Sequence, residues 1–201
     1  MPYFSHPDPS VKRKSGFLTP VYSSSDTLGR AINIPYFYVL SDAEDMTFNP
    51  RIYSDNDFIL QSEYRRVFEN SNLHADFSFN QDENKTNTHS IVILNGRFNP
   101  TTTYNFEFQN VSNDNYLKIH DFKNIAETNP LASSIDPSVQ TSFFKINKRF
   151  DEDTLLETSL RMYEDSTVNN DSDRYAYVFP DFSFDKRINL DESYYGTFDF
   201  G

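Results

Sequence analysis

Cysteine and tryptophan are absent from the 201 residues, and only 5 glycines are present. Without cysteine, this stretch has no disulfide framework, no CxxC zinc or redox site and no cysteine nucleophile. Neither GxGxxG nor GxxxxGK[ST] occurs, and both phosphate-binding patterns depend on glycines that let the backbone approach the phosphate. The sequence therefore offers no thiol chemistry and no recognisable nucleotide site.

Positive charge and long apolar runs are also scarce. The chain has 18 Lys and Arg against 30 Asp and Glu, which gives a formal net charge of −12. Phosphate contacts need a basic surface, so no nucleic-acid partner is expected. No apolar run approaches the roughly 20 residues of a membrane-spanning helix. The first residues, Met1 to Phe4, show no basic segment followed by an apolar one, so they do not predict a signal peptide.

Aromatic residues are abundant, with 20 Phe and 13 Tyr. Many are separated by single polar residues, and this alternation is typical of strands with one apolar and one wet face. From Leu73 to Phe79, for example, odd-numbered residues are apolar and even-numbered residues are polar. Strands are predicted over residues 16–23, 28–40 (broken at Pro35), 46–53, 58–68, 73–79, 90–98, 102–111, 142–150, 154–163, 174–184 and 194–200.

The segments between these strands are polar, acidic and unequal in length. Residues 80–84 and 164–173 are predicted to be loops, and residues 113–134 form the longest stretch without alternation, with a short helix expected within 115–122. The chain shows no repeat and no domain linker after Ser15. The sequence therefore predicts an all-β protein, an antiparallel meander of about ten strands.

Two architectures fit such a meander. In a soluble sandwich, one face of each strand packs inward and the other meets water. In an outer-membrane barrel, the apolar face meets lipid, the polar face lines a wet lumen, and aromatic residues gather at the interfaces. The barrel better explains the length of many strands, the abundance of tyrosine and the low apolar content. The alternation alone leaves both architectures open.

Motifs in the first third of the chain favour the barrel. They are KRKSGFLTP at residues 12–20, IPYF at 34–37, DMTFNPR at 45–51 and EYR at 63–65. In this order they resemble the first barrel strands of the LPS-assembly outer-membrane proteins, the LptD (OstA) family. The resemblance rests on the segment from Pro2 to Pro20 and on the three later motifs. The rest of the chain fits by strand pattern only.

The resemblance implies a fragment of a larger protein. Residues 1–15 would be a linker from a missing periplasmic jelly-roll domain, and residues 16–201 would be the first part of a transmembrane β-barrel, which as a fragment is incomplete and forms a curved open sheet. The implied function is transport and insertion of lipopolysaccharide into the outer leaflet of a Gram-negative outer membrane, through a barrel that opens sideways. The implied partners are lipopolysaccharide, outer-membrane lipid, a plug lipoprotein and a periplasmic lipopolysaccharide-transport bridge.

The resemblance also implies site residues. Pro20 and Pro35 resemble prolines beside the family's lateral gate, whereas without the resemblance they would be expected only to mark strand ends or bulges. Three positive residues could contact lipid phosphates or form an interfacial cluster at the periplasmic rim: Lys12, Arg13 and Lys14. Three polar residues of one strand are expected to face the lumen: Gln61, Glu63 and Arg65.

Catalysis, cofactors and metals are not expected. The histidines at positions 6, 74, 89 and 120 show no HExxH or HxH spacing, and the acidic run at 151–153 is better explained as a solvated turn than as a cation site. Two other functions stay open from the residues. One is a different outer-membrane barrel, such as a porin or receptor. The other is a soluble acidic β-sandwich that binds carbohydrate.

Overall fold

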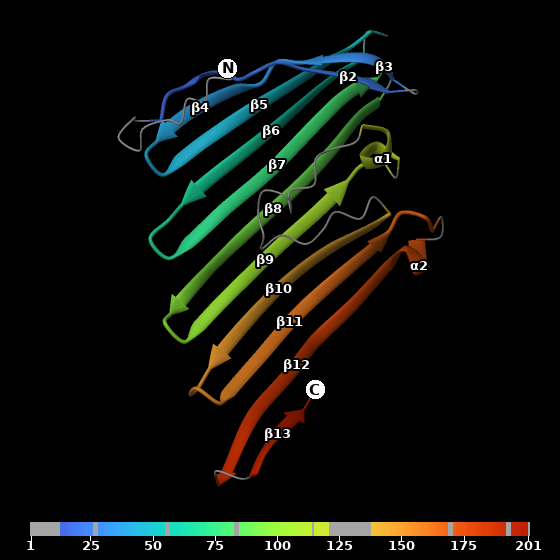
Figure 1. Cartoon of the computed structure of the whole chain (residues 1–201). Helices are drawn as coiled ribbons and strands as arrows, with labels where there is room; N and C mark the ends of the chain where they lie inside the picture. The colour runs from blue at the N-terminus through green and yellow to red at the C-terminus, as the bar shows by residue number, and fades with distance from the viewer. Residues whose placement is uncertain are drawn as a thin grey trace.

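The computed structural model describes residues 13–25, 28–54, 57–82, 85–113, 115–120, 138–168, 171–191 and 194–200. These residues form one antiparallel sheet of 13 strands (Figure 1). The strands are β1 (Gly16–Phe17), β2 (Val21–Ser25), β3 (Gly29–Asn33), β4 (Tyr36–Ser41), β5 (Glu44–Tyr53), β6 (Phe58–Val67), β7 (Ser71–Asp82), β8 (Lys85–Asn99), β9 (Thr102–Val111), β10 (Val139–Arg149), β11 (Thr154–Asp165), β12 (Tyr175–Asp191) and β13 (Tyr194–Phe200). Two short helices are α1 (Tyr116–His120) and α2 (Asp171–Arg174).

The order of the strands in the sheet follows the chain. From β4 to β13 each strand pairs with the next, while β1 pairs with β4, β2 with β3, and β3 with β5. The first strands and β13 lie at opposite edges of an open sheet (Figure 1). The predicted all-β antiparallel meander is confirmed, and the short helix predicted within 115–122 is α1.

The strand count exceeds the prediction because two strands are interrupted at proline. β3 and β4 keep one register with β5, since Asn33 faces Arg51 and Tyr36 faces Phe48. They are therefore two parts of one long strand, interrupted at residues 34–35. β1 and β2 likewise form one edge strand, interrupted at residues 18–20. The break at Pro35 was predicted from the sequence, whereas the break at Pro20 was not.

Two strands also run further than the apolar pattern predicts. β7 extends to Asp82 and β8 begins at Lys85, so residues 80–82 belong to a strand rather than to the predicted loop. Asn80 faces Asn87 across this ladder. Because the ladder is held by backbone hydrogen bonds, it continues where the side chains no longer alternate.

The two ends of the sheet have connections of different length. At one end, the turns after β4, β6, β8, β10 and β12 are two to four residues long. We call this the short-turn end. At the other end, the connections include residues 112–138, which contain α1, and residues 166–174, which contain α2. We call this the loop end. In Figure 1 the loop end, with α1 and α2, lies to the right.

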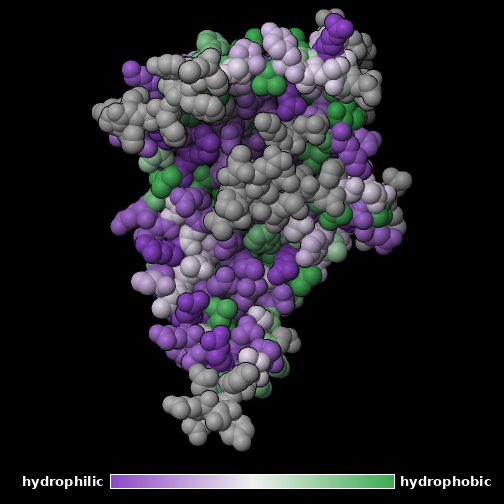
Figure 2. All heavy atoms as spheres, in the orientation of Figure 1, coloured by the Kyte–Doolittle hydropathy of each residue, from purple (hydrophilic) through white to green (hydrophobic). Residues whose placement is uncertain are grey.

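The two faces of the sheet differ in chemistry. On one face, large apolar side chains repeat across the strands; they include Phe58, Phe77, Phe79, Phe108, Leu160, Phe182 and Phe198, which are 37–53% exposed. We call this the apolar face. The opposite face carries mainly polar residues and is the one against which α1 packs, so we call it the α1 face. Hydrophilic residues predominate over the strands in the view of Figure 2.

Candidate functional site

The α1 face carries a cluster of charged and polar side chains over β5, β6 and β7. The register brings them together, because Asp45 faces Arg65, Gln61 faces Ser78, and Glu63 faces Asp76. The three residues predicted to face a lumen therefore lie on one face, together with partners from both neighbouring strands. The members of this polar cluster are Arg13, Asp45, Gln61, Glu63, Arg65, His74 and Asp76.

Asp45 is the most heavily bonded carboxylate of the polar cluster. It is only 4% exposed. Its Oδ1 accepts a hydrogen bond of 2.8 Å from Nε of Arg65, and its Oδ2 is ion-paired with the guanidinium of Arg13. The Arg13 guanidinium also lies 5.4 Å from the ring centroid of Phe37 on β4. Asp45 thus holds the residues just before β1 against β5.

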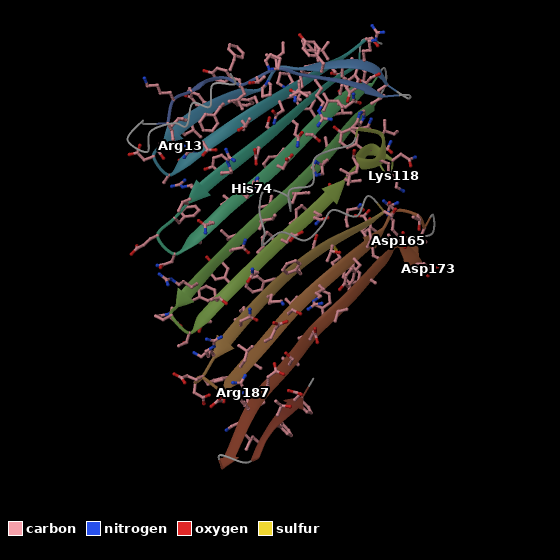
Figure 3. All side chains as sticks on the ribbon, viewed as in Figure 1. Arg13, His74, Lys118, Asp165, Asp173 and Arg187 are labelled. Carbon is pink, nitrogen blue, oxygen red and sulfur yellow. The ribbon has the colours of Figure 1, made fainter. Side chains whose placement is uncertain are left out.

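The remaining members form two short links across β6 and β7. Oε1 of Glu63 lies 2.7 Å from Nε2 of His74 and 3.9 Å from Nη1 of Arg65. Nε2 of Gln61 donates a hydrogen bond of 2.7 Å to Oδ2 of Asp76. Figure 3 shows His74 on β7 and Arg13 near the short-turn end. Because carboxylates and guanidinium groups are paired with each other, the cluster stabilises the contacts between β5, β6 and β7. It is not a set of reactive groups.

The helix α1 docks on the same face and reaches back to β5. Tyr116, Leu117 and His120 are buried, and the first two pack with Val111 at the end of β9. Nη1 of Arg51 on β5 donates a hydrogen bond of 2.7 Å to the carbonyl of His120. The connection after β9 is therefore tied to a strand four places away in the sheet order.

Burial shifts the titration of two groups in α1, which lies outside the strands. It raises the pKa of Tyr116 to about 12 and lowers the pKa of His120. The ring centroids of these two residues are 4.8 Å apart, edge to face. A neutral phenol and a neutral imidazole at ordinary pH suit an apolar contact under the helix, because neither group then brings a charge into it.

The structure describes two of the three residues of the predicted basic cluster. Lys12 lies outside the described residues, Arg13 is paired with Asp45, and Lys14 is exposed. The two described residues lie close to the short-turn end, since the hydroxyl of Ser15 accepts a hydrogen bond of 2.9 Å from the backbone N–H of Val39. A role in binding lipid phosphate stays a prediction for these residues.

The predicted prolines lie side by side at the edge of the sheet. Pro20 is exposed between β1 and β2, and Pro35 is buried between β3 and β4. The backbone N–H of Leu18 donates a hydrogen bond of 2.8 Å to the carbonyl of Pro35, so the two interruptions face each other. Each proline removes a backbone donor at the place where the ladder is broken.

Sequence reasoning missed Asp45, His74 and Asp76 as members of the polar cluster, and Arg51 as the contact to α1. The signal was present in β5, where polar Asp45, Thr47, Asn49 and Arg51 alternate with Met46, Phe48, Pro50 and Ile52. Such alternation assigns residues to a face, but the pairing between strands needs the register. The hydrogen bond from Arg51 to His120 joins residues 69 positions apart and has no local signal.

No catalytic or metal centre is assembled by the residues that the structure describes. Among them, no three His, Asp or Glu side chains come together as metal ligands. The turn with the acidic run is closed by its own hydrogen bonds: the hydroxyl of Thr154 donates to Asp151, which lowers the pKa of that carboxyl group. A pocket of about 240 Å³ beside β13 has mixed charges, including Arg149, Asp185 and Arg187.

The described residues contain no helix that is long and apolar enough to cross a membrane. No protein-family model matches the chain. Curated proteins do match it, and they are named LPS-assembly protein LptD. The protein from Shewanella denitrificans is 26% identical over 192 residues, which cover 94% of this chain and 24% of that protein. The protein from Shewanella oneidensis is 24% identical over 209 residues, covering 100% of this chain and 25% of that protein.

A shorter match has higher identity. The LPS-assembly protein LptD of Pseudoalteromonas translucida is 32% identical over 122 residues, which cover 58% of this chain and 16% of that protein. The chain thus spans about a quarter of the length of the relatives that it matches from end to end. The relatives are named as assembly proteins, which agrees with the expectation that the chain is not an enzyme.

Proposed function

We propose, from the premise that this chain is related to the LptD family, that it forms part of the wall of an outer-membrane β-barrel that transports lipopolysaccharide and inserts it into the outer leaflet. The apolar face would contact lipid, and the α1 face would line the lumen. The observation that carries the proposal is a single-layer sheet with one apolar and one polar face, in a chain related to LPS-assembly proteins.

The polarity of the two faces supports a membrane environment. A transmembrane barrel places apolar residues outward and polar residues inward, alternating along each strand. In β7, Phe77 and Phe79 lie on the apolar face and are 44% and 41% exposed, while His74, Asp76 and Ser78 are buried on the other face. A soluble sandwich would cover the apolar face with a second sheet, and the described residues form one sheet only.

The unequal ends of the sheet support one orientation in the membrane. Outer-membrane barrels have short periplasmic turns and longer external loops. The short-turn end would therefore face the periplasm, and the loop end with α1 and α2 would face outward. Arg13 and Lys14 would then lie on the periplasmic side, which suits a linker to a periplasmic jelly-roll domain at residues 1–15. Figure 3 shows Lys118, Asp165 and Asp173 at the opposite, loop end.

Pro20 and Pro35 would weaken the edge at which the barrel opens. In a bilayer, a backbone group without a hydrogen-bond partner costs several kcal/mol, because no water replaces the lost bond. An interrupted edge strand is therefore costly, and it is useful where lipid must leave sideways. Gln61, Glu63 and Arg65 would line the lumen. The polar cluster around them has three carboxylates and two guanidinium groups, and both guanidinium groups are paired with carboxylates. It would therefore let an anionic head group pass without holding it.

The partners follow from the same proposal. A lumen open at the periplasmic side would receive lipopolysaccharide from a periplasmic bridge, and a plug lipoprotein would occupy the polar interior. The energy for transport would be supplied elsewhere, because the chain offers no recognisable nucleotide site.

Depletion of the full-length protein tests the proposal. We expect less lipopolysaccharide at the cell surface within a few generations, with lipopolysaccharide retained in the inner membrane and periplasm. We also expect the intact protein to need detergent for extraction from the outer membrane. A protein that is extracted by salt alone, or whose depletion leaves surface lipopolysaccharide at its normal level, would show that the proposal is wrong.

A further inference from the structure

A third proline continues the interruption across the sheet. Pro50 lies within β5, and the two parts of the second long strand place Ile34 opposite it. The backbone N–H of Ile34 donates a hydrogen bond of 3.3 Å to the carbonyl of Pro50. Pro20, Pro35 and Pro50 therefore lie side by side on the first three long strands, and we call them the proline row.

Each of the first two interfaces between these strands loses one hydrogen bond at this row. In an antiparallel ladder, closely spaced partners exchange two N–H···O bonds. Ile34 donates to Pro50, but Pro50 has no N–H with which to return the bond. In the same way, Leu18 donates to Pro35, and Pro35 returns nothing. Both interfaces are thus weakened at the same position along the strands.

The weakening stops at β5. The carbonyl of Pro50 points toward the second long strand, and so does its nitrogen, because both groups of one strand residue point to the same side. The ladder between β5 and β6 consequently runs without a shift from Glu44 to Ile52. Pro180, another proline inside a strand, differs because it lies at a register shift in β12 that accommodates it.

Beyond the proline row, toward the loop end, lies the hairpin of β2 and β3. Its strands are paired along their whole length, from Val21 to Ser25, and its turn ends at Gly29, whose φ is 72°. Its attachment to the wall is shorter, since β3 pairs with β5 only from Ala31 to Asn33. A second tie joins the carbonyl of Arg30 to the backbone N–H of Ser54 at 2.8 Å.

We propose that this β2–β3 hairpin moves as one unit when the barrel opens, turning about the proline row, and that Pro50 is a positioning residue of the gate. This inference rests on the proposed function and deepens it. The seam that yields lies between β3 and β5, so β2 stays paired with β3 during opening. β5 stays paired with β6 and is the stationary side of the hinge.

Two disulfides that share one cysteine test which seam moves. Ile32 faces Tyr22 within the hairpin and Ile52 across the seam to β5. Partners in an antiparallel ladder have Cα atoms about 4.5–5.5 Å apart, which a disulfide can span. The full-length protein, as the only copy in the cell, would carry either Tyr22→Cys with Ile32→Cys or Ile32→Cys with Ile52→Cys. Each would be compared before and after reduction by dithiothreitol.

We expect the disulfide between positions 32 and 52 to reduce delivery of lipopolysaccharide to the surface at least tenfold, with recovery on reduction. The disulfide between positions 22 and 32 should change delivery less than twofold. Equal effects of the two disulfides, or a block by the 22–32 disulfide alone, would overturn the hinge. The proposed function would survive those results as long as depletion still removes surface lipopolysaccharide.

A single substitution gives an independent measurement. Pro50→Ala restores the missing N–H and should raise the temperature at which the folded protein is lost, while slowing delivery of lipopolysaccharide severalfold. A purely structural role would not produce a more stable protein with lower activity. Pro180→Ala is the matched control, and it should leave delivery unchanged. Normal delivery with Pro50→Ala, or equal slowing by both variants, would show that Pro50 does not position the gate.

Discussion

Asp45 shows how one residue ties the segment just before β1 to the sheet. Its carboxylate is nearly fully buried and bonds to two guanidinium groups, one from β6 and one from the residues before β1. A buried carboxylate is tolerable only when it is paired in this way. Both arginines remain more than 40% exposed, so they can be solvated if the carboxylate is removed.

Asp45→Asn should therefore destabilise the full-length protein moderately. We expect a loss of about 1–3 kcal/mol in the free energy of unfolding, because a charged hydrogen-bond partner is lost from a buried site. Urea unfolding followed by tyrosine fluorescence would measure it. Glu69→Gln, at an exposed carboxylate in the turn after β6, is the matched control and should stay within about 0.5 kcal/mol. Equal effects of the two substitutions would contradict the role given to Asp45.

At this scale, the sequence predicts faces better than partners. Gln61, Glu63 and Arg65 share a face because strand residues alternate, and this was evident from the sequence. Their contacts with Asp45 and His74 depend on register, which is set by turns and by packing across the whole ladder. The position of Arg13 depends on the path of the chain before β1, for which the sequence gives no periodic signal.

At the scale of elements, the two interrupted strands are the most informative feature. Proline was expected to break the second long strand, and it does so at residues 34–35. The first long strand also breaks, because three residues, 18–20, oppose the two residues 34–35. That bulge follows from the pairing of the two interrupted strands, so it could not be derived from the sequence of either strand alone. The extension of β7 and β8 through polar residues has the same origin, since backbone pairing continues without an apolar pattern.

If the proposed gate lies at these prolines, the double substitution Pro20→Ala with Pro35→Ala should tighten the first edge of the sheet. Alanine restores an N–H to each strand, so the full-length protein should resist heat better while delivering less lipopolysaccharide to the surface. Semi-native gels and quantification of surface lipopolysaccharide would measure the two effects. Pro180→Ala is again the control, because its proline lies in β12, far from the first strands in the sheet order. Unchanged surface lipopolysaccharide in the double variant would count against a gate at these prolines.

At the scale of the whole molecule, the sheet has two faces of different chemistry. The opposite chemistry of its faces explains how a chain with a net charge of −12 can expose many phenylalanines. The charges lie at the ends and on the α1 face, and the apolar face carries exposed phenylalanines such as Phe77, Phe108 and Phe182. Alternation in the sequence predicted this division, whereas the docking of α1 on one face was not predicted, because it joins distant segments.

Two adjacent residues of β12 test whether the apolar face and the α1 face meet different solvents. Phe182 is 51% exposed on the apolar face, and Ser183 points to the opposite side. Phe182→Arg should cost about 2–4 kcal/mol in the full-length protein in lipid, the range measured for arginine near the bilayer centre. Ser183→Arg should cost clearly less, because the proposed wet lumen would solvate the charge. Refolding into vesicles, followed by denaturant titration, would compare them; equal costs would mean that the two faces meet the same solvent.

The long connection between β9 and β10 has a consequence for the order of assembly. Neighbouring strands elsewhere are joined by short segments, so each can add to the growing sheet with little loss of chain entropy. Residues 112–138 make this one connection much longer. With loop-closure entropy growing as the logarithm of length, closing it costs roughly 2 kcal/mol more than a two-residue turn. The strands up to β9 and those from β10 onward should therefore form as two separate nuclei that join last.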